Sequence, residues 1–233
     1  MPSFSNQPGS RESSTEAHKQ PSLGQRQLRI TALIDWLKDS DATLRSEVAL
    51  ALGRMGADAR DAVPALAAAL KDSDPNMRSA AAWALGKIGP DARDAVPALA
   101  AVLTEPNRDV RCEAAWALGR IGPDARDAVP ALAAALKDSD QFVRAGAAVA
   151  LGKIGPDARD AAPGLVAALK DPDQFVRAGA ASALGQIGPD ARDAVPALAA
   201  ALKDSEWGVC RQAAWALRRI GPDGEVRNTV TEG

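Results

Sequence analysis

Histidine and aromatic residues are scarce in this 233-residue sequence, which has one His, three Phe, five Trp and no Tyr. The single histidine, His18, lies in the first 25 residues, so the rest of the chain offers no imidazole for a Ser-His-Asp or Cys-His site. The two cysteines, Cys112 and Cys210, form no CxxC pair and have no spacing typical of a metal site. These absences favour a non-enzymatic function, and we expect no catalytic residues, no metal and no cofactor.

Long apolar runs are also missing, because Gly, Pro or Asp interrupts each apolar stretch before it reaches the roughly 20 residues that cross a membrane. The Ser-, Gln- and Pro-rich start lacks the apolar core of a secretory signal peptide. A formal net charge of -2 gives no global basic field for nucleic acid. We therefore expect a soluble, cytoplasmic protein with a disordered N-terminal tail over residues 1–25 and a short C-terminal tail over residues 224–233.

Alanine and leucine dominate the rest of the chain, which favours an all-α fold because both are strong helix formers. A unit of 33 residues recurs, marked by Pro64, Pro97, Pro130, Pro163 and Pro196. About six copies fit between residues 26 and 223. Cys112 and Cys210 lie three copies apart, roughly 30 Å at about 10 Å per helix layer. That separation exceeds the reach of a disulfide, so we expect free thiols.

Each unit is predicted to be a pair of helices. Asp61 is in position to cap the first helix, whose first turn holds Pro64. Asp74 and Pro75 are typical of the start of the second helix, and Gly89 of its end. One such hairpin cannot bury the apolar faces of both helices, so stacking on neighbouring hairpins has to supply the core.

Five glycines support close stacking, because each occupies the same position inside a second helix. A mid-helix glycine costs about 1 kcal/mol relative to alanine, so this recurrence indicates close approach of a neighbouring helix. In the last copy the position holds Arg218, as expected where no further repeat follows. The glycines are Gly53, Gly86, Gly119, Gly152 and Gly185.

The recurring phrase is Val-Arg, then Ala-Ala, then Ala-Leu-Gly-x-Ile-Gly, as in residues 143–155. It resembles the short bacterial HEAT-like repeat first associated with phycobilisome lyases. The ankyrin and tetratricopeptide signatures of similar period are missing. The resemblance implies a right-handed α-α superhelix, a HEAT-like solenoid whose second helices line a concave surface. It says little about function, because this repeat class serves scaffolds, lyase subunits, hydroxylases and DNA-binding enzymes alike.

A row of arginines runs parallel to a row of acidic turn residues. One interpretation is an anion-binding line, and the other is a ladder that ties each repeat to its turn or its neighbour. We favour the ladder, since a functional site rarely needs the same residue in every unit. The arginines are Arg45, Arg78, Arg111, Arg144 and Arg177, and the acidic residues are Asp39, Asp72, Glu105, Asp138, Asp171 and Asp204.

Positions that vary between the copies gather on the second helix, on a stripe pointing away from the core. Outward aromatic residues usually mark a binding surface, and Trp and Arg dominate interface energetics. We therefore predict a partner-binding face. Its aromatic members are Trp83, Trp116, Phe142, Phe175, Trp207 and Trp215, and its basic members are Lys87, Arg120, Lys153 and Arg219. The alternatives are that Trp83 and Trp116 lie flat against neighbouring helices and that the basic residues complement helix dipoles.

Three functions are consistent with such a face. The leading hypothesis is a non-catalytic scaffold that binds a protein or peptide, with the basic row favouring an acidic rim on that partner. The second is a bilin lyase-like or tetrapyrrole-binding subunit. Cys112 lies on the same stripe as Trp116 and is a candidate for involvement, but we favour the alternative that this lone thiol among alanines is a small apolar filler. Nucleic-acid binding ranks third because the net charge is slightly negative. The oligomeric state stays open, with Trp36 and Leu37 as a second contact patch.

Overall fold

The computed structural model describes residues 23–221, and every regular element in that range is helical. The predicted C-terminal tail and nearly all of the predicted N-terminal tail lie outside these residues. Helix α1 (Leu23–Trp36) begins before residue 26, so the predicted boundary falls inside the helix.

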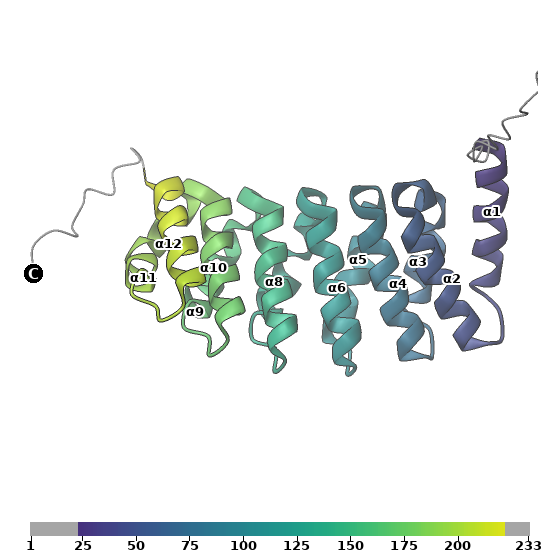
Figure 1. Cartoon of the computed structure of the whole chain (residues 1–233), viewed down its shortest axis with the longest axis horizontal. Coiled ribbons are helices and arrows are strands. Elements are labelled where there is room, and N and C mark those ends of the chain that lie inside the picture. The colour runs from purple at the N-terminus through teal and green to yellow at the C-terminus, as the bar shows by residue number, and fades with distance from the viewer. Residues whose placement is uncertain (1–22, 222–233) are drawn as a thin grey trace, which may run out of the picture.

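The described chain forms six helical hairpins stacked in chain order, which confirms the predicted all-α solenoid (Figure 1). The first helix of each later hairpin is short, and the second is longer. The first helices after α1 are α3 (Val63–Ala69), α5 (Val96–Ala101), α7 (Val129–Ala135), α9 (Ala162–Ala168) and α11 (Val195–Ala201). The second helices are α2 (Ala42–Met55), α4 (Pro75–Ile88), α6 (Arg108–Ile121), α8 (Gln141–Ile154), α10 (Gln174–Ile187) and α12 (Trp207–Ile220).

The start of each later first helix differs from the prediction. A 3-10 helix, Gly56–Ala62, leads directly into α3, and Ala62 before it already has helical torsions and makes no side-chain cap. The prediction that Asp61 caps this helix is therefore wrong. The continuous helical entry supplies acceptors for N–H groups that a cap would otherwise satisfy. Asp61 instead accepts a hydrogen bond from Gln27 Nε2 at 2.6 Å.

The second helices begin and end as predicted. The Asp74 carboxylate accepts a hydrogen bond from the Asn76 N–H at 3.0 Å, and Pro75 follows as the first helical residue. At the other end, Gly89 adopts a φ of +75°, which glycine tolerates far better than other residues. In the last repeat Glu206 takes the capping position and makes no side-chain cap bond. These caps hold the starts of the second helices, where Phe142 and Phe175 lie in α8 and α10.

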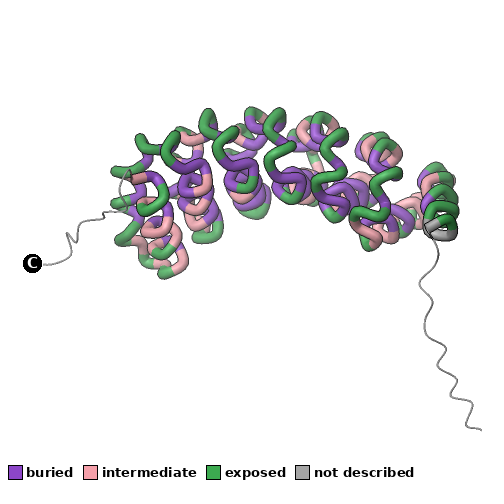
Figure 2. The backbone as a smooth tube through the Cα atoms, turned by 90° about the horizontal axis from the view of Figure 1, so that it is seen from above, coloured by how far each residue is buried: buried purple, intermediate pink, exposed green. Residues whose placement is uncertain are grey.

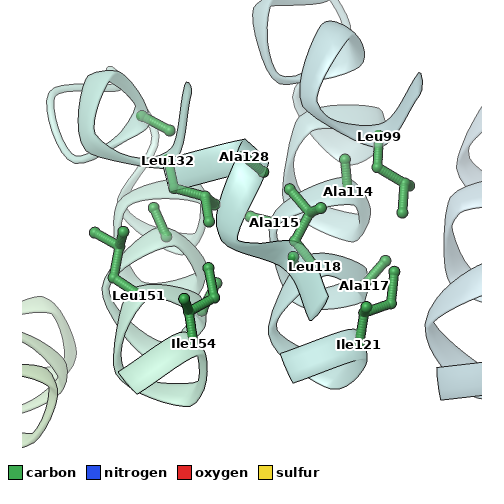
Figure 3. Packing of buried hydrophobic residues seen from close by; sticks show 14 of the residues in the cluster. Leu99, Ala114, Ala115, Ala117, Leu118, Ile121, Ala128, Leu132, Leu151 and Ile154 are labelled. Atoms are coloured by element: carbon green, nitrogen blue, oxygen red, sulfur yellow. The ribbon is translucent and has the colours of Figure 1, made fainter. Parts of the chain in front are cut away.

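Leucine, isoleucine and alanine from successive hairpins form one continuous core (Figure 3). Leu118 and Leu151 are fully buried, as are Leu99 and Leu132 on the first helices. Among the described residues no polar or charged residue is fully buried. Each layer is therefore held by apolar contacts with the next, as the repeat pattern predicted.

Close approach of the second helices bends the stack. A Cβ added to Gly86 would lie 2.9 Å from Ala117 Cα on the next second helix, which confirms the reason for the glycine row. Consecutive even-numbered helices contact each other extensively, whereas consecutive odd-numbered helices scarcely touch. The stack consequently curves with the even-numbered helices on its inner side (Figure 2). Arg218, which replaces the glycine in the last repeat, is exposed.

The arginine row is a structural ladder. Arg45 donates from Nε and Nη2 to the two carboxylate oxygens of Asp72 in the next repeat, at 2.9 and 2.8 Å, and from Nη1 to the carbonyl of Asp39 at 2.8 Å. The hydrogen bond from Arg45 lowers the pKa of Asp72 below its ordinary value. The same bidentate contact joins Arg111 to Asp138, Arg144 to Asp171 and Arg177 to Asp204. These guanidinium groups are committed to the fold, so they do not form an anion-binding line.

Candidate functional site: an apolar groove on the concave face

The concave face is hollowed where α6, α8 and α10 meet. A cavity of about 480 Å³ opens there between Trp116, Phe142 and Phe175, over a floor that includes Val149 and Gly179. We call this hollow the apolar groove. It joins three of the ten sequence-predicted binding residues, Trp116 from α6, Phe142 from α8 and Phe175 from α10.

The two phenylalanines are held at the rim by the caps of their helices. The Asp140 carboxylate accepts a hydrogen bond from the Phe142 N–H at 2.9 Å, and Asp173 does the same for Phe175 at 2.9 Å. The Phe142 side chain is nevertheless 53% exposed and that of Phe175 67% exposed. A fixed backbone thus presents two large apolar side chains to solvent, an arrangement that typically marks a contact surface.

Small residues make the floor of the groove. The position that holds Trp83 and Trp116 in the second and third repeats holds Val149 in the fourth and Ser182 in the fifth. Further floor positions were not among the predicted binding residues, although a repeated phrase in the sequence marks them. The phrase Gln-Phe-Val-Arg-Ala-Gly-Ala-Ala occurs at residues 141–148 and 174–181 and in no other repeat. The missed residues are Ala145, Ala178 and Gly179.

Of the three tryptophans at this repeat position, two turn toward the preceding second helix and one toward the following second helix. Trp83 turns back over the preceding helix, where a Cβ on Gly53 would meet its Cζ3 at 2.5 Å. Trp116 instead contacts the following helix, where a Cβ on Gly146 would lie 3.3 Å from its Nε1. The repeat position of Gly146 holds Glu113 in front of Trp83, so glycine provides room only for Trp116. No helix follows Trp215 within residues 23–221, and Trp215 turns back over Gly185.

The flat-packing alternative therefore describes Trp83 and Trp215, which are half-buried and cover a neighbouring glycine. Trp116 is 36% exposed and forms a wall of the apolar groove. Trp207, at the start of α12, is 72% exposed and has the guanidinium of Arg211 4.8 Å from its ring centre. It does not line the apolar groove. The structure thus separates the predicted aromatic residues into one cluster and three individual positions.

The basic residues lie at the opposite end of the second helices from the phenylalanines. Lys87, Arg120 and Lys153 are exposed. The Lys87 ammonium group lies 5.2 Å from the ring centre of Trp83. Arg219 lies 5.1 Å from the ring centre of Trp215 and donates from Nε to the Gly185 carbonyl at 3.0 Å. Lys87 and Arg219 therefore already have partners within the protein, while Arg120 and Lys153 project from this edge.

A second, smaller hollow of about 290 Å³ lies between α2, α4 and α6. We call it the polar pocket, because Asn76, Ser79, Asp109 and Glu113 line it beside Trp83. Glu113 is half-buried, and this burial raises the pKa of its carboxyl group, although Arg120 and Lys87 act in the opposite direction. The polar pocket and the apolar groove give the two halves of the concave face different chemistry.

Cys112 precedes Glu113 on α6 and packs against the core. It is a free, half-buried thiol whose pKa is raised by burial and by the charge of Glu113. A raised pKa keeps the thiol protonated, which is the reverse of what an activated nucleophile requires. Within residues 23–221 no group of His, Cys, Asp and Glu side chains is arranged to hold a metal ion. No helix in the same range is long and apolar enough to cross a membrane.

Comparison with known proteins identifies the repeat. The HEAT repeats family matches residues 30–111, 96–185 and 162–228, which together include nearly all of the stacked hairpins. This chain belongs to the HEAT repeat family. The HEAT repeats thus account for the fold, in agreement with the resemblance in the sequence, and such solenoids commonly bind proteins or peptides. No curated protein matches the chain.

Several solved structures have a similar fold. An engineered protein is 28% identical with a TM-score of 0.71, over 82% of this chain and 96% of that one. A chain from the complex of CpcE and CpcF of phycocyanin lyase from Nostoc sp. PCC7120 is 30% identical with a TM-score of 0.61, over 91% of this chain and 82% of that one. A designed armadillo repeat protein in complex with the peptide (KR)4 is 19% identical with a TM-score of 0.70, over 82% and 99%.

Proposed function

We propose that this HEAT repeat protein is a non-catalytic scaffold that binds a segment of another protein on its concave face. The observation that carries the proposal is the apolar groove, where Phe142 and Phe175 stand exposed over a floor of small residues. An apolar side chain of the partner would enter the groove and contact Trp116 and both phenylalanines.

The energetics of such a contact are favourable because the groove is preformed. Burial of apolar surface yields about 25 cal/mol per Å², and a central aromatic contact contributes about 2 kcal/mol or more on truncation. Rigid helices hold the phenylalanines before the partner arrives, so little ordering entropy is lost at the site. Arg120 and Lys153, exposed at the other end of the second helices, would favour acidic residues along that edge of the partner.

The proposal is tested by selecting peptides from a random phage-displayed library on the full chain. The selected peptides are then titrated calorimetrically against two double variants. Phe142→Ala/Phe175→Ala removes the rim of the groove and should weaken binding by about 30-fold or more, the equivalent of about 2 kcal/mol. Val195→Ala/Leu202→Ala removes two exposed apolar residues belonging to the α11 region and should leave affinity unchanged. Equal losses in the two variants, or loss only in the second, would place the binding surface elsewhere.

A tetrapyrrole-binding or lyase-subunit function is the second candidate, favoured by the 30% identity to a chain of the phycocyanin lyase complex. In that case the aromatic side chains would contact a pigment, and Arg120 and Lys153 would pair with its propionates. Burial raises the pKa of the Cys112 thiol, which disfavours the thiolate that covalent attachment would require. Titration with a free bilin tests this function: a spectral shift lost in Phe142→Ala/Phe175→Ala supports it, and an unchanged absorption spectrum contradicts it.

A further inference from the structure

The two hollows of the concave face share helix α6. Glu113 lines the polar pocket and Trp116 lines the apolar groove, and the two residues are three apart in sequence. Residues three apart on a helix lie on the same face, one turn from each other. A bound segment that places a side chain in the groove therefore passes within a helical turn of the Glu113 carboxylate.

The charge of the polar pocket is of one sign. Its lining contains the carboxylates of Asp109 and Glu113 and no lysine or arginine. Asp109 already has an ion pair with Arg108, at 3.3 Å. Glu113 has no ion pair among residues 23–221, although it is half-buried. The turn carboxylates Asp72 and Asp138, in contrast, are held by the arginine ladder. Arg120 and Lys87 act on the Glu113 carboxylate through space but form no ion pair with it, so its oxygens can accept hydrogen bonds from a ligand.

We propose that the partner segment carries a lysine or arginine that enters the polar pocket beside Glu113 while an adjacent apolar side chain fills the apolar groove. This inference rests on the scaffold function proposed above. It specifies the chemistry of the bound segment and how its two anchoring residues are placed along the solenoid. The cationic residue faces the N-terminal repeats and the apolar residue faces the C-terminal repeats. Complementary charge at a partly desolvated site contributes specificity and fixes the register of the bound chain.

The pocket offers a cation more than one acceptor. Asn76 and Ser79 line the same hollow as Glu113 and supply side-chain oxygens from α4. An approaching ammonium or guanidinium group would also relieve the cost of holding the Glu113 carboxylate charged while half-buried. An acidic residue at this place would meet two carboxylates and be rejected. The pocket therefore distinguishes partners that the apolar groove alone would not.

The test uses the peptides selected on the full chain and a matched pair of variants. Glu113→Gln keeps the shape of the pocket and removes its charge. Glu47→Gln makes the same change at the equivalent position of α2, where the side chain is exposed and outside the pocket. We expect selected peptides to combine a bulky apolar residue with a lysine or arginine. They should bind Glu113→Gln about tenfold more weakly and Glu47→Gln with unchanged affinity. Replacing the peptide cation by methionine should cost the same factor with the wild type and nothing further with Glu113→Gln.

The outcomes separate this inference from the proposed function. Peptides that depend on Phe142 and Phe175 but carry no cation, or bind Glu113→Gln as tightly as the wild type, overturn the inference and leave the scaffold function standing. Peptides that bind independently of the phenylalanines, or a selection that yields no binding peptide, overturn both. Self-association of the chain through this face would appear as a dimer that Phe142→Ala/Phe175→Ala dissociates, and it would also overturn the inference.

Discussion

Replacing Gly86 by alanine tests the packing that creates the concave face. A methyl group at this position would lie 2.9 Å from Ala117 Cα and 3.1 Å from Ala117 Cβ. The nearer atom belongs to the backbone of α6, so no side-chain rotation relieves the contact and the two helices have to separate. Overpacking of this kind costs about 1–3 kcal/mol.

Helix propensity acts in the opposite direction. Alanine is about 0.8–1.0 kcal/mol more favourable than glycine inside a helix. Gly208 of α12 supplies the control, because a Cβ added there would meet nothing within 4 Å. Gly208→Ala should therefore stabilise the chain by up to about 1 kcal/mol, whereas Gly86→Ala should destabilise it.

The assay is urea unfolding of both variants, followed by circular dichroism. We expect the free energies of unfolding of Gly86→Ala and Gly208→Ala to differ by about 1–3 kcal/mol, because the propensity gain is roughly common to both and only the first overpacks. Equal stabilisation by the two substitutions would refute the close approach of α4 and α6, and with it the explanation of the curvature.

Three further predictions concern the core, the ladder and the pocket. Leu151→Ala should cost about 2–5 kcal/mol in urea unfolding and Phe175→Ala less than about 1, because only the first side chain is buried; equal costs would contradict the exposure of the groove. Burial raises the pKa of Asp138 and Asp171, but hydrogen bonds from Arg111 and Arg144 and from the backbone N–H groups of Asp140 and Asp173 together hold it below the ordinary 3.8. The two aspartate–arginine pairs therefore stabilise the fold above that pH, and this stability is lost as the pH falls through the lower pKa values of the folded state. The urea concentration at the unfolding midpoint should consequently decrease when the pH is lowered below about 4. A midpoint that stays constant from neutral pH to acid would count against this coupling. The pKa of Glu113 is raised above 4.5, so Glu113→Gln should increase the melting temperature at neutral pH. This gain in melting temperature should disappear at acid pH, where Glu113 of the wild type is protonated. A gain that persists at acid pH would contradict the assignment of the cost to the buried charge.

Most of the fold follows from local sequence signals. Asp74, Pro75 and Gly89 bound a second helix where the capping rules place its ends. The rule failed at Asp61 because it assumes that a helix starts from extended chain, whereas α3 continues a 3-10 helix. Nothing in the composition of residues 56–62 indicates whether α3 starts from extended chain or continues a 3-10 helix.

The candidate site was less predictable, because it depends on contacts between repeats. Helical periodicity placed Trp83 and Trp116 on the same stripe, yet they turn in opposite directions. The difference follows from the next helix, which presents Glu113 to one and Gly146 to the other. Periodicity within a single helix carries no information on such neighbours. The small residues of the floor do have a signal in the sequence, the phrase Gln-Phe-Val-Arg-Ala-Gly-Ala-Ala that only the fourth and fifth repeats contain.

Hydrogen–deuterium exchange of the full chain, with and without a selected peptide, tests most directly that the concave apolar groove is the binding site. We predict added protection in residues 141–149 and 174–182, which include the rim and much of the floor of the groove. The odd-numbered helices, on the outer side of the bend, should exchange at unchanged rates. Protection confined to the odd-numbered helices would contradict the account.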